Sequence, residues 1–315
     1  RIRPYGQHTL RAAVLSPDGS RVACSDSVST KVYAIQSLGK RRKVAVQKVA
    51  LGKELRTPAS CLAFAMNGKA LVAAGMDGRI RILAFEQLGH FGQPGQLGQQ
   101  GQQEQQEHGQ EEEEEEEERV GRAKAVLLAT FELPDKFVGM VVSHLAVSQD
   151  GAWLGAATGS RVHVYAMDSF AHFWTLPSFS RDVTALAFHP NALEVFVATA
   201  ENRLHVAQIE QKRFSAWTRA LHKEMPAQLL SRPECIHGFS FDPLSSSRFV
   251  AFSQGFACFI DREKEIPSTV RIIGPDGAEI ADRRGRKRQR SESDLGSRQE
   301  EPTTNGEAIR DNFVI

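Results

Sequence analysis

Short apolar runs recur along the chain in sets of three, and turn residues separate the runs of each set. The third set is the clearest, with apolar runs at 142–147, 153–157 and 161–165 and the dipeptide Asp150-Gly151 after the first run. Asp-Gly adopts the positive φ values of tight hairpins, and the flanking Val, Ile, Leu and Phe suit strands. Each set therefore predicts a small antiparallel sheet.

Four further sets follow the same order of strand, turn and strand, at 10–35, 60–83, 183–207 and 236–260. One sheet cannot bury its apolar face alone, so neighbouring sheets must stack. The spacing is near the roughly 40–45 residues of a WD repeat, which favours a propeller over a sandwich. The predicted fold class is all-β, a WD40-type β-propeller that is incomplete, with about five recognisable blades.

Alternation of apolar and polar residues predicts which strand residues face solvent. In the run 161–165, His163 alternates with Val162 and Val164, and His205 has a similar setting. Because successive side chains of a strand point to opposite faces, both histidines are expected on polar faces.

Low-complexity stretches set the predicted domain boundaries. Blades are expected over 1–87 and 123–277, and the Gln/Gly/Glu-rich insertion 88–122 is expected to be a disordered loop between blades. Residues 278–311 predict a basic disordered linker, and 312–315 resemble the start of a truncated strand. The chain begins at Arg1 without an initiator Met, which suggests a fragment of a longer protein.

Charge is distributed unevenly along the chain. The formal net charge is +1, but Glu104, Glu107 and the run 111–118 supply ten of the 38 acidic residues. Removing those ten negative charges from the total leaves +11 on the remainder. A balance this basic favours a polyanionic partner such as RNA or DNA.

Two basic clusters are the candidate binding residues. The first is expected at a propeller rim, between the first two repeat units, and consists of Lys40, Arg41, Arg42 and Lys43. The second is typical of a nuclear-import signal or a polyanion site and consists of Arg283, Arg284, Arg286, Lys287, Arg288 and Arg290. A solvated loop remains an alternative for the first cluster. No aromatic residue interleaves with the second, so we expect contacts to phosphates there, and Ser291 beside it is a candidate phosphosite.

No catalytic, cofactor-binding or metal-binding motif is found. Asp18, Asp150 and Asp242 belong to the repeated hairpin turn, so they are not interpreted as paired catalytic acids. The four cysteines lie singly in apolar segments, which predicts buried reduced thiols. No apolar run approaches the roughly 20 residues that span a bilayer. We therefore expect neither an enzyme, nor a cofactor, nor a small-molecule substrate, nor a membrane partner.

The stretch from about Met140 to Pro267 resembles the cirhin family of nucleolar WD-repeat proteins. The resemblance rests on phrases in order, which are residues 143–154, 162–165, Pro177, 183–191, 217–219 and 236–243. It implies most of a C-terminal propeller in a tandem-propeller subunit of the small-subunit processome. The implied function is a nuclear and nucleolar scaffold for 18S ribosomal RNA maturation, linked to ribosomal DNA transcription.

The partners implied by the resemblance are other WD-repeat subunits of the processome. Contact between the basic loops and pre-ribosomal RNA is a further expectation. The alternative function is a WD-repeat adaptor in another nuclear complex, for chromatin or ubiquitin-ligase assembly. A propeller hydrolase or lyase would need acids converging on a central channel, which the sequence does not offer.

Overall fold

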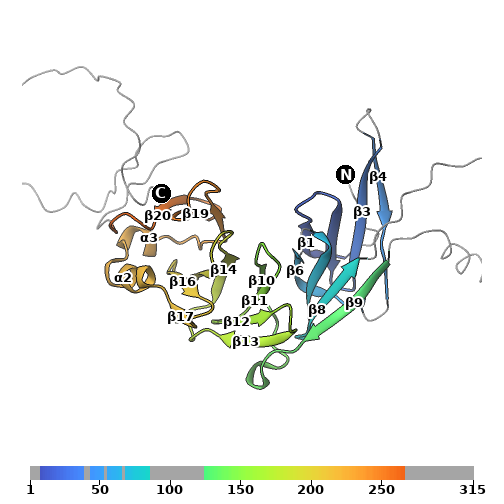
Figure 1. The fold of residues 1–315 in the computed structure, drawn as a ribbon, viewed down its shortest axis with the longest axis horizontal. Coiled ribbons are helices and arrows are strands. Elements are labelled where there is room, and N and C mark those ends of the chain that lie inside the picture. Colours follow the sequence, from blue (N-terminus) through green and yellow to red (C-terminus); the bar gives the residue numbers. More distant parts are fainter. Residues whose placement is uncertain (1–7, 39–42, 53–54, 66–67, 86–123, 267–315) are drawn as a thin grey trace, which may run out of the picture. The chain divides into compact units, whose positions relative to one another are not determined.

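The structure is a computed structural model, and it describes residues 8–38, 43–52, 55–65, 68–85 and 124–266. Strands dominate the described residues, and they form five separate sheets, called blades below (Figure 1). Contacts divide the chain into two compact units, residues 1–183 and 184–315, which are described one at a time.

The first unit contains three blades. Neighbouring strands in each blade follow one another in the chain, except that β5 lies beside β9 in blade 2. Blade 1 consists of β1 (Leu10–Leu15), β2 (Arg21–Asp26), β3 (Thr30–Leu38) and β4 (Lys43–Lys48). Blade 2 consists of β6 (Ala59–Ala65), β7 (Ala70–Gly75), β8 (Ile80–Phe85) and β9 (Lys124–Phe131), and the short β5 (Ala50–Leu51) pairs in parallel with β9. Blade 3, preceded by the 3-10 helix Asp135–Phe137, consists of β10 (His144–Val147), β11 (Trp153–Thr158), β12 (Arg161–Ala166) and β13 (Ala171–Thr175).

The second unit contains two blades and two helices. Blade 4 consists of β14 (Val183–Phe188), whose first residue is the last of the first unit, β15 (Glu194–Thr199), β16 (Leu204–Gln208) and β17 (Arg213–Phe214). Helices α2 (Ala216–Glu224) and α3 (Ala227–Leu230) follow. Blade 5 consists of β18 (Gly238–Phe241), β19 (Arg248–Phe252) and β20 (Ala257–Asp261). Helix α2 begins where the Ser215 hydroxyl accepts a hydrogen bond from the Thr218 N–H, as an N-cap does.

The apolar core lies between blades, because a single sheet has no interior of its own. Ala23, Val32 and Ala34 of blade 1 pack in one cluster with Leu71 and Leu83 of blade 2. A second cluster joins blades 2 and 3, and a third joins blade 4, both helices and blade 5. Stacking of neighbouring sheets, which the repeats predict, is therefore what buries the strands.

The basic cluster 40–43 and the acidic insertion 88–122 each connect two strands of one blade, which corrects the prediction that both lie between blades. The stretch 88–122 lies outside the described residues, but its flanking strands β8 and β9 pair with each other in blade 2. The cluster 40–43 joins β3 to β4 within blade 1. The prediction of loops between blades is wrong in both cases, because the outer strands β4 and β9 are not recognised in the repeat pattern.

All four cysteines are free thiols. Cys24 and Cys258 are buried, as predicted, whereas Cys61 and Cys235 are only half-buried. Burial raises the pKa of Cys61 to about 11, although a hydrogen bond with Ser60 acts against the shift. The Cys61 thiol is therefore protonated at neutral pH and is a weak nucleophile.

Candidate functional site

The hairpin turn between the first two strands of a blade has the same construction in blades 1 and 3. In blade 1 the Ser16 hydroxyl donates to the Asp18 carboxylate at 2.6 Å, and the Ser16 oxygen accepts from the Arg21 N–H at 2.8 Å. Gly19 completes the turn at φ +69°. Blade 3 repeats these bonds with Ser148 and Asp150 in place of Ser16 and Asp18.

The acids of these turns have a structural role. Burial acts to raise the pKa of Asp18, but hydrogen bonds from Ser16 and Ser20 and the charge of Arg21 outweigh it and lower the pKa to about 2. A hydrogen bond from Ser148 likewise lowers the pKa of Asp150. A carboxylate held ionised by its own turn is a poor general acid at neutral pH, which agrees with the structural interpretation of both residues.

The two strand histidines are buried, so their assignment to polar faces is wrong. His163 has no exposed surface and His205 has 8%. His163 instead lies between two hydroxyls, with Nε2 3.2 Å from Thr158 Oγ1 and Nδ1 2.9 Å from Thr175 Oγ1. Alternation does not distinguish faces in an inner strand whose two faces are both covered, as in β12.

The burial of His163 is expected to make the stability of the fold depend on pH. Burial first, and then the charges of His172 and Arg161, lower its pKa from 6.5 to about 4. The unfolded chain therefore binds more protons between these two values, so stability falls as the pH drops from 6.5 towards 4. We expect His163 to cost about 2 kcal/mol of unfolding free energy between pH 7 and pH 5. Urea unfolding at both pH values measures this, and a His163→Gln variant with the same pH dependence as the native chain would contradict it.

Polar contacts join blade 1 to the chain segment that enters blade 2. The Ser25 oxygen accepts a hydrogen bond from the Ala59 N–H at 2.8 Å. Thr30 donates its hydroxyl to the Thr57 carbonyl at 2.7 Å and its N–H to the Arg56 carbonyl at 3.2 Å. These bonds place Arg56 against the turn between β2 and β3.

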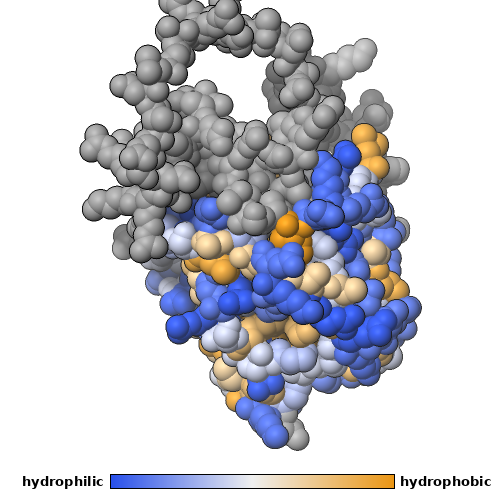
Figure 2. Space-filling view, turned by 90° about the vertical axis from the view of Figure 1, so that its left-hand side faces the viewer, coloured by the Kyte–Doolittle hydropathy of each residue, from blue (hydrophilic) through white to orange (hydrophobic). Residues whose placement is uncertain are grey.

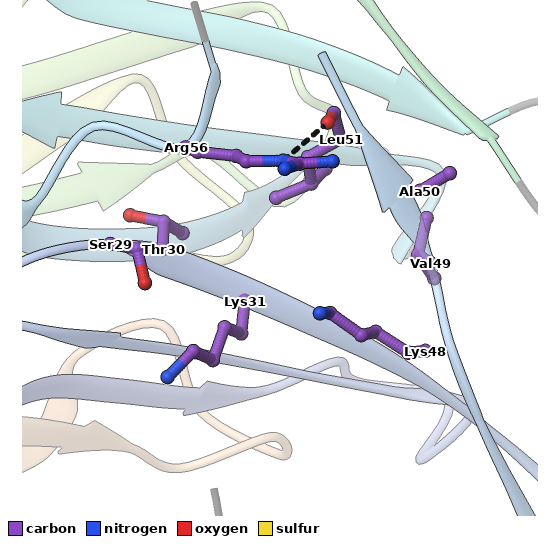
Figure 3. A pocket seen from close by; sticks show the side chains of 8 residues that line it. All are labelled: Ser29, Thr30, Lys31, Lys48, Val49, Ala50, Leu51 and Arg56. Carbon is purple, nitrogen blue, oxygen red and sulfur yellow. Dashed lines mark hydrogen bonds between the residues drawn. The ribbon is translucent and has the colours of Figure 1, made fainter. Parts of the chain in front are cut away.

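A cavity of about 440 Å³ opens at this junction (Figure 3). It lies between the β2–β3 turn, the end of β4, β5 and the segment before β6. Its lining residues are Ser29, Thr30, Lys31, Lys48, Val49, Ala50, Leu51 and Arg56. Three of the eight are basic and none is acidic or aromatic. We call this cavity the basic pocket.

The three cations of the basic pocket differ in their partners. Lys31 Nζ lies 2.9 Å from Asp26 Oδ2, and this bond raises the pKa of Lys31. Burial acts against ionisation of Asp26, but hydrogen bonds from Lys31, Ser29 and Val28 lower its pKa to about 2. The charges of Lys31 and Asp26 therefore cancel, and the pair stabilises the β2–β3 turn.

Lys48 and Arg56 carry the uncompensated charge of the pocket. Both side chains are exposed, and the Arg56 Nε donates to the Leu51 carbonyl at 2.9 Å (Figure 3). Among the described residues, no acidic side chain lies in an ion pair with either. The pocket is therefore suited to an anion, because an Arg fork and a Lys point charge are common ligands of phosphate and carboxylate groups.

The predicted basic clusters lie almost entirely outside the part of the chain that the structure describes. Residues 40–42 and 283–290 and Ser291 lie outside the described residues, and Lys43 begins β4. The pocket cations were missed because they are single residues in separate segments. The order of the strands could have indicated that Lys31 and Lys48 lie near each other, since the start of β3 and the end of β4 lie at the same end of an antiparallel hairpin.

Other kinds of site receive little support from the described part of the chain. It contains no group of three or more His, Cys, Asp or Glu side chains placed to hold a metal ion. No helix in it has the length and apolar character to cross a membrane. Figure 2 shows one face on which hydrophobic residues are scattered among hydrophilic ones. Exposed apolar residues scattered in this way are ordinary on protein surfaces.

Comparison with known families identifies the repeat. The family described as WD domain, G-beta repeat, matches residues 52–82, which include β6, β7 and the first half of β8. The chain contains a WD repeat. With this match, the five blades confirm the predicted all-β fold of the WD40 propeller type.

Three similar proteins carry the same name. The chain is 32% identical over 131 residues to the mouse "U3 small nucleolar RNA-associated protein 4 homolog" and 31% identical to the human homolog, over 41% of this chain in each case. It is 22% identical over 278 residues, or 83% of this chain, to the fission yeast protein of that name, U3 small nucleolar RNA-associated protein 4. The matches span 19% of the mouse and human relatives and 34% of the yeast relative. U3 small nucleolar RNA-associated protein 4 is also called cirhin, which is the family that residues 140–267 resemble in sequence.

Proposed function

We propose that this chain is a non-catalytic scaffold of the small-subunit processome, which acts on nascent pre-ribosomal RNA in the nucleolus. The observation that carries the proposal is the similarity to proteins named as U3 small nucleolar RNA-associated, together with the WD repeat. Membership of the cirhin family is part of the proposal. The proposed partners of this chain are other WD-repeat subunits of the processome, together with pre-ribosomal RNA.

The blade architecture supports a scaffold. The hairpin turns that the structure describes are held on a stacked core, so they present recognition surfaces on a rigid base. The acids in the turns of blades 1 and 3 are engaged in turn hydrogen bonds. These hydrogen bonds fix the geometry of the turns.

Co-purification from the native cells tests the proposal. The full-length parent protein is tagged and purified at moderate salt, and its partners are identified by mass spectrometry and RNA sequencing. We expect processome subunits and pre-ribosomal RNA to be enriched over a tagged, unrelated propeller. Enrichment of a chromatin or ubiquitin-ligase complex instead would transfer the function to a WD-repeat adaptor of another nuclear assembly.

The two basic clusters extend the proposal. We assign residues 283–290 to nuclear import or to contact with RNA phosphates, and 40–43, which connect β3 to β4 of blade 1, to a second contact of that kind. The motivation is their density of Lys and Arg and the excess of positive charge outside residues 104–118. Contacts of this kind weaken steeply as salt rises.

Phosphorylation of Ser291 is expected to weaken RNA binding by the adjacent cluster. A phosphate adds a charge of about −2 beside Arg288 and Arg290 and competes with RNA for them. RNA affinity is measured before and after kinase treatment, for the native chain and for Ser291→Ala. The effect should disappear in the variant, and equal losses in both proteins would remove Ser291 from the mechanism.

A further inference from the structure

The basic pocket of the first unit lies outside every candidate that the sequence provides. It combines segments from both sides of a blade junction: the β2–β3 turn and β4 of blade 1, and β5 with the segment before β6. Lys48 and Arg56 are 8 positions apart in the chain, and neither belongs to a dense basic cluster. Their proximity is a product of the fold.

The pocket is held in place before any ligand binds. Asp26 accepts hydrogen bonds from the Val28 and Ser29 N–H groups at 2.8 and 2.7 Å, which fixes the turn. Arg56 is tied through its backbone carbonyl to Thr30 and through Nε to Leu51. A cation that is already oriented loses less conformational entropy when it binds an anion.

We propose that the basic pocket binds a backbone phosphate of RNA. Arg56 is suited to the phosphate through its two terminal nitrogens, Lys48 supplies a second positive charge, and Ser29 adds a half-buried hydroxyl at the wall. The inference rests on the proposed function for its choice of RNA, and it adds a specific site to that function.

The surroundings favour a polymer over a single phosphate group. Lys124 is exposed at the start of β9 and pairs in register with Ala50, a residue of the pocket wall, so positive charge continues onto the next strand. A cavity of about 440 Å³ exceeds one phosphate group and leaves room for an adjoining sugar. No aromatic side chain lines it, so base stacking is not expected and binding should depend little on RNA sequence.

Charge reversal in the pocket tests the site. Binding of labelled single-stranded RNA, about 20 nucleotides long so that it exceeds the usual site size of one binding domain, is measured by anisotropy with the full 315-residue chain. The double variant Lys48→Glu, Arg56→Glu should bind about tenfold more weakly. Its slope of log affinity against log salt should be shallower by about 1.4, the value for two lost single-strand contacts. Two RNA sequences should give the same loss.

A matched pair controls for overall charge. The variant Lys69→Glu, Arg219→Glu changes the net charge equally at two exposed positions outside the pocket and should change affinity less than twofold. Equal losses in both double variants would overturn the site and leave only general electrostatic attraction. Lys48→Ala, which breaks no hydrogen bond among described residues, should alone weaken binding about threefold with an unchanged melting curve.

Competition distinguishes other sources of phosphate. Unlabelled RNA should displace the probe at far lower concentration than inorganic phosphate or a phosphoserine peptide. If the native chain binds the phosphopeptide more tightly than RNA and only that binding is lost in the pocket variant, the assignment to RNA is wrong. If the native parent associates with the processome but the pocket variant binds RNA normally, the pocket fails and the proposed function stands. If the pocket variant loses RNA affinity but the parent associates with another complex, the proposed function fails and the pocket stands.

Discussion

Replacing Phe196 with alanine is expected to lower the free energy of unfolding of the second unit by about 3–5 kcal/mol. Phe196 on β15 is 1% exposed and occupies the centre of the cluster that joins blades 4 and 5. Its ring centroid lies 4.9 Å from that of Phe241 and 5.0 Å from that of Phe249. Removal of the ring leaves a cavity that these packed neighbours cannot fill without moving. Urea denaturation followed by tryptophan fluorescence measures the loss, with Trp153 and Trp174 of blade 3 replaced by Phe in every protein compared, so that the signal comes from Trp217, which packs on the same cluster.

Phe259 on β20 provides a matched control for this variant. It is 57% exposed, so Phe259→Ala removes the same side chain with little new cavity and should cost about 1 kcal/mol or less. Phe196→Leu should lower the free energy of unfolding less than Phe196→Ala does, because leucine retains most of the side-chain volume. Similar losses for Phe196→Ala and Phe259→Ala would show that the cluster does not form the core of this unit.

Replacing Asn202 with alanine is expected to cost about 2–4 kcal/mol, through lost hydrogen bonds and backbone strain. Asn202 has no exposed surface and adopts φ +57° in the turn between β15 and β16. Its Nδ2 donates to the Glu234 carbonyl at 3.0 Å, and its Oδ1 accepts from the buried Ile236 N–H at 2.9 Å. The change therefore leaves buried backbone groups without partners and detaches the segment that leads into blade 5.

Asn202→Gly separates the two causes. Glycine loses the same side-chain hydrogen bonds but tolerates a positive φ, so it should be more stable than alanine at this position by about 1 kcal/mol. Hydrogen exchange at Ile236 should increase in both variants. Full protection of that amide in Asn202→Ala would mean that the side chain does not hold the segment.

Asn202 has a counterpart in the first unit, and the likeness bears on function. Ser25 and Thr30 near the β2–β3 turn of blade 1 bind the segment that enters blade 2, as Asn202 binds the segment that enters blade 5. The same kind of contact positions Arg56 at the basic pocket. Junctions between blades thus stabilise the stack and also place side chains that are available to partners.

Much of the fold follows from local sequence. The turns at Asp18-Gly19 and Asp150-Gly151 adopt the positive φ that their composition predicts, and three strands of each repeat are where the apolar runs indicate. The outer strands β4 and β9 were missed, although Val44-Ala45-Val46 and the run 125–129 are apolar. Only β9 follows a long insertion, and sequence pattern alone does not show that a strand rejoins its sheet across a stretch such as 88–122.

By itself, the sequence determined the class of fold, the number of blades and the absence of recognisable catalytic motifs, because hairpin turns and strand patterns are local properties. Only the tertiary structure decided which face of a strand is buried and which cations meet. His163 is buried because its strand is covered on both faces, and Lys48 and Arg56 converge because the end of β4 and the segment before β6 meet at a blade junction. These facts depend on contacts between segments, which the alternation of residues along one strand cannot specify.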